Sequence, residues 1–223
     1  MPERSPAFRK KRPREWAHEG DVCMSASASE TVFETERLLV QVASDQDAAL
    51  FYDLWTNPQV MHNVGFPQGL PITQKEIQER INNQENPPFD HLLVVRLKSS
   101  GESIGECHLH PPDEERIART DVKLLPAYWG YRYGVEIKRG LLQFLFNHTE
   151  CIAVEATPNV ENAASIKMQE AVGGRRVGEA VVEFPASMQG YTKPVHHYIY
   201  RVYRDDWLKS RQEEQGRAAH HAL

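Results

Sequence analysis

The turn at residues 125–134 is the segment of the chain best suited to bind a phosphate group, and it reads Leu-Pro-Ala-Tyr-Trp-Gly-Tyr-Arg-Tyr-Gly. It joins an apolar strand pattern to an amphipathic helix pattern, and a helix begins with unpaired N–H groups and a partial charge of about +0.5. A glycine-bearing turn at such an end lets several amides converge on an anion, and Arg132 adds a positive charge. Glycines four residues apart before a helix also serve packing, so both interpretations stay open. The turn matches neither the GxGxxG fingerprint of dinucleotide-binding proteins nor a Walker A loop.

Four further residues have polar side chains that could take part in binding or chemistry. Asn162 occupies an N-cap position with Ser165 three residues later, a spacing that fits ordinary capping as well as contact with a ligand. Asp121 lies on the strand before the turn, and Glu106 lies on the preceding strand. Each carboxylate is a candidate general base if burial raises its pKa toward neutrality, and each also fits a solvated strand position.

The elements that must position these residues alternate between strand and helix patterns. Asp45 and Asp47 offer caps to a helix carrying Leu50 and Leu54, and Thr73 with Glu76 forms a capping box for a second helix. Apolar residues at i, i+4, i+7 and i+8 predict a core-facing helix after the turn: Ile137, Leu141, Phe144 and Leu145. A further helix is predicted over 162–172. Strands are predicted at 35–40, 91–97, 103–109, 121–125, 151–156, 175–184 and 197–203.

Composition places the chain among ordinary folded proteins. It has 223 residues, of which 40% are hydrophobic and 26% charged, and a net charge of −5 that argues against a nucleic-acid-coating protein. No apolar run approaches the roughly 20 residues of a membrane-spanning helix. Cys23, Cys107 and Cys151 form no CxxC pair, and nothing resembles a secretory leader, so we expect a reduced, cytoplasmic setting. No set of three or four converging ligands predicts a metal site.

The ends of the chain differ from its middle. We expect a disordered basic and polar tail over 1–30, a folded domain over 31–210 and a polar tail over 211–223. The basic run at 9–14 fits a solvated tail, an upstream extension before Met24, or a nucleic-acid arm.

Four segments together resemble the GNAT acetyltransferases. The turn at 126–134 is similar to their acetyl-CoA pyrophosphate loop, most of all in the branch of ribosomal-protein alanine acetyltransferases. Residues 162–170, Asn-Ala-Ala-Ser-Ile-Lys-Met-Gln-Glu, are similar to that branch's Asn-x-Ala-Ser-Ile-Arg-Val-Leu-Glu. Residues 34–38 near the start and 204–207 near the end also match, so the resemblance covers roughly 33 to 210.

The resemblance implies a GNAT fold: an α/β domain with a mixed, mostly antiparallel sheet of about six to seven strands, splayed at the acetyl-CoA site and flanked by about four helices. It implies N-acetyl transfer from acetyl-CoA, without a metal, to the amine of a protein N-terminus or a small molecule. Ser165 is then the candidate acid for the thiolate, and Asp121 and Glu106 are the candidate bases. The implied cofactor contacts are Leu124, Leu125, Trp129, Gly130, Tyr131, Arg132, Tyr133, Gly134 and Asn162.

The chain departs from the family at two positions. Arg132 stands where the family usually has glycine, so it strains the loop or grips a phosphate. Gly174 replaces the phenylalanine that usually follows Gly173. These departures keep a second hypothesis open, a GNAT-fold module that binds CoA, acyl-CoA or a partner with little catalysis. The last two predicted strands also offer an edge for a homodimer.

Overall fold

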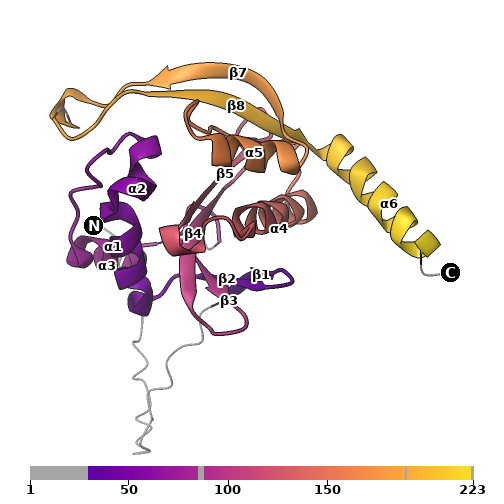
Figure 1. The fold of residues 1–223 in the computed structure, drawn as a ribbon, viewed down its shortest axis with the longest axis horizontal. Coiled ribbons are helices and arrows are strands. Elements are labelled where there is room, and N and C mark those ends of the chain that lie inside the picture. The colour runs from indigo at the N-terminus through magenta and orange to yellow at the C-terminus, as the bar shows by residue number, and fades with distance from the viewer. Residues whose placement is uncertain (1–29, 85–87, 189, 222–223) are drawn as a thin grey trace, which may run out of the picture.

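An eight-stranded sheet runs through residues 30–84, 88–188 and 190–221, the part of the chain that the computed structural model describes (Figure 1). The strand order is β1-β2-β3-β4-β5-β6-β8-β7. The strands are β1 Thr31–Glu34, β2 Leu38–Val42, β3 Leu93–Leu97, β4 Ser103–His110, β5 Ile117–Leu124, β6 Ala153–Ala156, β7 Arg175–Val182 and β8 Val195–Tyr203. The helices are α1 Ala48–Thr56, α2 Pro58–Met61, α3 Gln74–Asn82, α4 Tyr133–His148, α5 Ala163–Ala171 and α6 Arg204–His221.

The fold class predicted from the sequence is confirmed. Every neighbouring pair of strands is antiparallel except β5 and β6, which are parallel. The sheet has eight strands where six to seven were predicted, because the sequence pattern did not reveal β1. β1 is a four-residue edge strand whose residues are exposed or half-buried, so it lacks the buried alternation that marks a strand in sequence. α2, with four residues, is too short to show a helical period.

Helices cover both faces of the sheet, and strand alternation assigns each side chain to one of them. Val95 packs in the cluster that includes Leu141 and Leu145 of α4, whereas its neighbour Val94 packs with Phe51 of α1. In Figure 1, α1, α2 and α3 lie on one side of the sheet, and α4 and α5 lie together on the other. The candidate site lies inside the sheet, where β5 and β6 are neighbours.

Of the predicted helix starts, that of α3 is confirmed by side-chain contacts, whereas the predicted cap of α1 was wrong. The Asp47 side chain does not cap α1 but accepts a hydrogen bond from the Ser44 amide at 2.9 Å, one turn earlier. The Thr73 hydroxyl accepts a hydrogen bond from the Glu76 amide at 3.3 Å, and the Glu76 carboxylate accepts one from the Thr73 amide at 2.8 Å, which is the predicted capping box of α3. The predicted strand at 121–125 was wrong in extent, because β5 begins at Ile117. Its first three residues pair with β6, and Arg119 also pairs with β4. The polar Arg119 and Thr120 interrupt the apolar pattern, so the sequence did not indicate a strand there.

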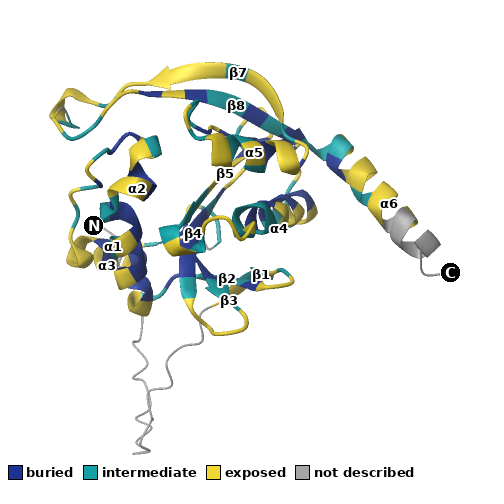
Figure 2. Ribbon diagram, in the orientation of Figure 1, coloured by how far each residue is buried: buried dark blue, intermediate teal, exposed yellow. Residues whose placement is uncertain are grey.

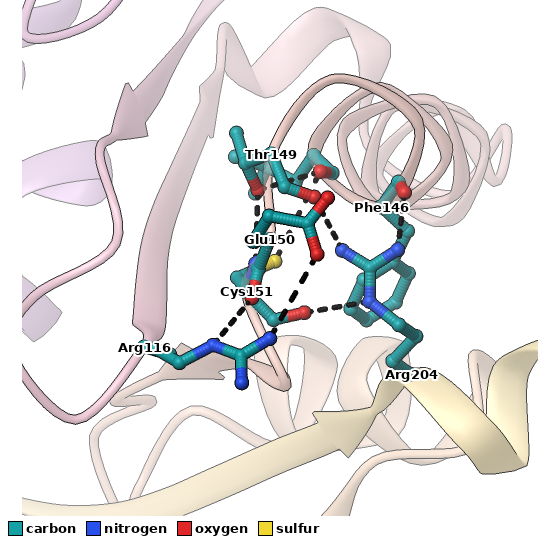
Figure 3. A network of polar contacts seen from close by, with 7 residues as sticks. Arg116, Phe146, Thr149, Glu150, Cys151 and Arg204 are labelled. Atoms are coloured by element: carbon teal, nitrogen blue, oxygen red, sulfur yellow. Dashed lines mark hydrogen bonds and ion pairs between the residues drawn. The ribbon is translucent and has the colours of Figure 1, made fainter.

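Arg204 ties the end of α4 to the start of α6 (Figure 3). Its guanidinium donates hydrogen bonds to the carbonyls of Phe146 at 2.5 Å, Thr149 at 2.5 Å and Cys151 at 2.7 Å. From the other side, Arg116 donates to the carbonyl of Glu150 at 2.9 Å. The carbonyls at a helix C-terminus lack partners within the helix and carry partial negative charge. These contacts therefore fix one end of α4, whose other end forms the candidate site.

The last helix leaves the body of the protein. α6 includes most of the segment 211–223, which we expected to be a polar tail, and it points away from the sheet in Figure 1. Trp207 in its first turns is buried against Phe146, and the residues at 208–214 that follow are largely exposed (Figure 2). Because the segment 211–223 has no apolar face, its residues show no helical periodicity from which a helix could be predicted. The basic run at 9–14 and Cys23 lie outside the described residues. None of the described helices has the length and apolarity needed to cross a membrane.

Candidate active site

β5 and β6 separate along their length and leave backbone groups of β5 without a strand partner on that side. Their parallel pairing covers Ile117 to Arg119 on β5 and stops where Arg119 meets Glu155. β5 continues to Leu124, still paired with β4 on its other edge. Unpaired strand groups bind an extended ligand in the way that they bind another strand. The splay therefore provides a site for an elongated, amide-containing molecule.

The turn after β5 leads into the N-terminus of α4. Gly130 has φ +85° and Arg132 has φ +65°, so both adopt the left-handed conformation. This geometry leads the chain into α4 with Arg132 as the N-cap residue. Gly134 has a different role, because a Cβ atom there would lie 3.0 Å from the Met168 sulfur of α5. The first glycine thus shapes the loop, and the second lets α5 approach α4.

Glu136 in the first turn of α4 holds this loop against the start of the sheet. Its Oε1 accepts hydrogen bonds from the Thr35 hydroxyl at 2.6 Å and the Arg37 amide at 2.9 Å, and its Oε2 accepts one from Arg37 Nε at 2.7 Å. Desolvation would raise the pKa of Glu136, but these donors lower it overall. The Arg37 guanidinium also lies 4.4 Å from the centre of the Tyr133 ring. The motif at 34–38 therefore holds the loop before α4 in place, although the two segments are far apart in sequence.

A cleft of about 660 Å³ runs from this loop along the splay. Its walls come from β5, the loop, α4, α5, the segment after β6 and α2. Most residues predicted to form the site line it, namely Asp121, Leu124, Trp129, Gly130, Arg132, Tyr133, Gly134, Asn162 and Ser165. Tertiary structure thus brings together two motifs that are separated by α4 and β6.

Three predicted site residues lie outside the cleft. Tyr131 points into solvent with 60% of its surface exposed and stacks on Tyr133 at 5.8 Å. Leu125 packs against the cluster of α1, α2 and α3. Glu106 is fully buried beneath α1, where its Oε1 accepts a hydrogen bond from Trp55 Nε1 at 2.8 Å. Glu106 shares this face of the sheet with Asp121 and Lys123, which do line the cleft, but it is itself fully buried and does not.

The two carboxylates proposed as bases share one lysine. Lys123 forms ion pairs with Asp121 and, at 3.1 Å, with Glu106, because the three residues lie on the same face of β4 and β5. Burial would raise the pKa of each carboxyl group. The Lys123 ammonium outweighs this effect, lowering the pKa of Glu106 and bringing that of Asp121 to about 2. The raised pKa that the base hypothesis required is therefore absent at both residues.

Ser165 is held in the first turn of α5 by the cap that the sequence indicated. The Asn162 side-chain oxygen accepts a hydrogen bond from the Ser165 amide at 3.0 Å. This geometry confirms the capping role of Asn162, and the same residue also lines the cleft. The Ser165 hydroxyl has no hydrogen-bond partner within the described residues, so it is available to a ligand.

Sequence reasoning missed three polar residues of the site. Lys123 stands two positions from Asp121 on one strand face, a spacing that indicated their pairing. Asn159 lines the cleft and donates a hydrogen bond to the carbonyl of Asn63 at 3.3 Å, which joins the segment after β6 to the α2 region. Lys138 is buried in α4 beside the splay. It lies on the same helical stripe as Leu141, Leu142 and Leu145. A lysine within an apolar stripe was the feature of the sequence that could have indicated a buried functional residue.

Three aromatic residues near the cleft, Trp55, Phe66 and Tyr191, pack against neighbouring side chains. Trp55 and Phe66 are buried, and the Phe66 ring lies 5.2 Å from that of Phe184 and 6.4 Å from that of Tyr191. Residues of α2 and the following turn face the open end of the cleft instead: Gln59, Val60, Asn63 and Val64. Cys107 and Cys151 are buried in the core, and burial raises the pKa of the Cys107 thiol.

Comparison with known proteins agrees with this geometry. Residues 37–175 match the family model of the GNAT acetyltransferase domain. The chain is 26% identical over 181 residues to the uncharacterized protein YkkB of Bacillus subtilis, which covers 78% of this chain and 98% of that protein. A GNAT-family acetyltransferase structure from Bacillus anthracis superposes with a TM-score of 0.65 at 20% identity, covering 77% of this chain and 98% of the other. The spermidine N-acetyltransferase of Vibrio cholerae, solved with CoA and spermine, superposes with a TM-score of 0.63 at 17% identity. The match covers 77% of this chain and 98% of that one.

The splayed sheet and the amide-bearing loop define an acyltransferase of the GNAT class. The family match spans more than half of the chain, and the chain belongs to the GNAT acetyltransferase family.

Proposed function

We propose that this enzyme transfers the acetyl group of acetyl-CoA to a primary amine by direct attack, with no covalent enzyme intermediate. The carrying observation is the cleft of about 660 Å³ that joins the open edge of β5 to the amides at the start of α4. Those amides and Arg132 suit a pyrophosphate, and the β5 edge suits the amides of a pantetheine arm. The proposed contacts are Leu124, Trp129, Gly130, Arg132, Tyr133, Gly134 and Asn162.

The chemistry divides between β5 and α5. The neutral amine attacks the thioester carbonyl, and a β5 amide near Leu124 stabilises the developing oxyanion. As the C–S bond breaks, the Ser165 hydroxyl donates its proton to the departing sulfur and regains, through water, the proton that the attacking nitrogen loses. The protein contributes mainly by holding the two reactants in this geometry.

The carboxylate of Asp121 acts through its charge. A group whose pKa is about 2 remains ionised at neutral pH and is a weak proton acceptor. Its side chain is 52% exposed and lines the cleft, so it attracts the ammonium form of the acceptor. The proton then leaves that ammonium through water. Glu106, buried behind Lys123, keeps the lysine in place.

Cofactor binding is tested by thermal unfolding with acetyl-CoA, using ATP as a phosphate-bearing control. A ligand at a hundred times its Kd stabilises the native state by about 2.7 kcal/mol. For a chain of this size we expect the unfolding midpoint to rise by roughly 5 to 10 °C with acetyl-CoA and much less with ATP. An equal response to both ligands, or no response at millimolar acetyl-CoA, contradicts the cofactor site.

Two substitutions separate the proposed roles, once an amine screen that measures released CoA thiol has found an acceptor. Ser165→Ala should lower kcat by about 10²-fold and leave acetyl-CoA affinity unchanged, since only the leaving sulfur loses its donor. Asp121→Asn should raise the KM for a cationic amine about tenfold with a smaller change in kcat, and this effect should weaken in high salt. A pure loss of kcat in Asp121→Asn would make it a proton acceptor after all.

We also infer a homodimer formed through β7 in the cytoplasm. β7 is an edge strand of the sheet, and Val177, Val181 and Val182 on it are exposed (Figure 2). An exposed apolar edge strand invites pairing with a second copy. Analytical ultracentrifugation should give a dimer for the native chain and a monomer for Val181→Lys; a native monomer refutes the inference.

A further inference from the structure

A second void of about 100 Å³ extends the floor of the cleft between β5 and β6. The two voids share several lining residues, namely Asp121, Val122, Thr157, Pro158, Ser165 and Met168. The smaller void is closed by Lys138 of α4 and Gln169 of α5. It therefore lies next to Ser165, where the reactive end of an acyl-CoA is expected under the proposed function.

The walls of this void are polar even though they are buried. Lys138 is 1% exposed, Gln169 is 3% exposed and Thr120 is 8% exposed. Lys138 Nζ donates a hydrogen bond to the Thr120 hydroxyl at 2.5 Å. Within the described residues no carboxylate lies within 4.0 Å of this ammonium, and the nearby Asp121 is already paired with Lys123. The void is thus bordered by a lysine that has no charged partner.

A buried ammonium in this situation is unfavourable until an anion reaches it. Burial lowers the pKa of Lys138 to about 7, and the charge of Asp121 opposes this only in part. The groups facing Lys138 from β6 and α5 carry no charge: Ala156, Thr157, Ser165, Met168 and Gln169. A bound carboxylate would restore the charged lysine and complete its hydrogen bonding.

The size of the void bears on what can fill it. About 100 Å³ exceeds what one water molecule requires, so there is room for a short chain beyond the methyl carbon of an acetyl group. An acetyl group has no atom that uses the ammonium. An acyl chain a few carbons long that ends in a carboxylate would use both the space and the charge.

We propose that Lys138 and the void beside it bind the free carboxylate of a short dicarboxylic acyl group, which makes the CoA monothioester of a dicarboxylic acid a second and tighter-binding class of acyl donor. This inference rests on the proposed function, since the thioester must occupy the same cleft. The reaction balances as before: the amine gains the acyl group, the C–S bond breaks, and the sulfur takes the proton. The product is an amide with a free carboxylate.

Binding measurements test this without knowledge of the acceptor amine. Isothermal titration calorimetry at pH 7.5 compares succinyl-CoA with butyryl-CoA, which has the same chain length without the charge, and with acetyl-CoA and CoA. The native enzyme should bind succinyl-CoA at least about tenfold more tightly than butyryl-CoA, as one charge-assisted hydrogen bond predicts. In buffers of different ionisation enthalpy, succinyl-CoA binding should also take up protons, because the carboxylate favours charged Lys138.

Two variants locate the effect. Lys138→Met, close in shape and without charge, should lose the preference and the proton uptake and keep its acetyl-CoA affinity; Lys138→Gln serves as a second variant should the first fail to fold. Lys167→Met removes a charge from the outer wall of the same cleft and should alter all four ligands alike.

Several results would overturn the inference. Equal binding of succinyl-CoA and butyryl-CoA by the native enzyme contradicts it, as does a succinyl preference that survives in Lys138→Met. If Lys138→Met weakened only the binding of free CoA, and only at alkaline pH, the Lys138 ammonium would be a partner of the CoA thiolate and not of an acyl carboxylate. If the native enzyme binds none of the thioesters, the proposed function fails first, and this inference fails with it.

Discussion

We expect Arg132→Gly to raise the stability of the protein and to weaken the proposed binding of acetyl-CoA. Arg132 adopts φ +65° at the N-cap of α4, and its side chain is exposed beside the cleft. Within the described residues its guanidinium makes no ion pair or hydrogen bond. Contacts within the protein therefore do not explain an arginine at a position where the left-handed backbone favours glycine.

The effect on stability is the difference between two small terms. A non-glycine residue in the left-handed region is disfavoured by about 1 to 2 kcal/mol. Glycine also makes the unfolded chain more disordered, which offsets about 0.4 to 1 kcal/mol of the gain. We expect Arg132→Gly to raise the free energy of unfolding by at most about 1.6 kcal/mol, measured by urea denaturation without cofactor.

The effect on binding is larger and has the opposite sign. A guanidinium that contacts a phosphate is worth about 1.5 to 3 kcal/mol, and its exposure to solvent reduces this to about 1 to 2 kcal/mol. Arg132→Gly should therefore weaken acetyl-CoA binding by roughly 5- to 30-fold at low salt. The loss should shrink at 0.5 M NaCl, where the Debye length falls well below 10 Å.

Calorimetric titration of acetyl-CoA provides the assay, and two further variants provide controls. Arg132→Asn tolerates the left-handed conformation and lacks the charge, so it should bind like the glycine variant. Arg132→Lys keeps the charge and should retain most of the affinity. Unchanged or tighter binding by Arg132→Gly would refute the reasoning, because the arginine would then only strain a loop that works better with glycine.

Two other substitutions test how α4 is held. Glu136→Gln should lower the free energy of unfolding by about 1 to 2 kcal/mol at pH 7, since the Arg37 contacts are partly exposed. The folded-state pKa of Glu136 lies below its ordinary value of 4.5, so its contribution is present above that pH and is lost as the pH falls through the lowered pKa. Urea denaturation should accordingly show the native and variant curves converging toward pH 3, and a gap that stays constant with pH would contradict the ion-pair account. Arg204→Met should cost about 2 to 3 kcal/mol and lower the thermal midpoint by roughly 5 to 10 °C, because three carbonyls lose a charged donor. Arg211→Met on the same helix should change the thermal midpoint little. An equal effect of both variants would argue against a special role for Arg204.

Local patterns in the sequence determined most of the elements and the position of the turn at 125–134 before α4. The capping residues Thr73 and Asn162 act within three residues of their partners, so their spacing alone predicts the contact. The stripe containing Ile137 and Leu141 likewise repeats with the period of one helix. Features of this kind depend only on backbone geometry, which the order of residues fixes directly.

Tertiary structure decided the electrostatics of the site and the roles of distant residues. Asp121 and Glu106 were recognised as carboxylates, yet strand pairing places Lys123 between them and lowers both pKa values. Glu136 and Arg37 meet across 99 positions of chain. A pKa depends on burial and on charges a few ångströms away. Those neighbours come from other strands and helices, so the sequence names the groups and the packing determines what they do.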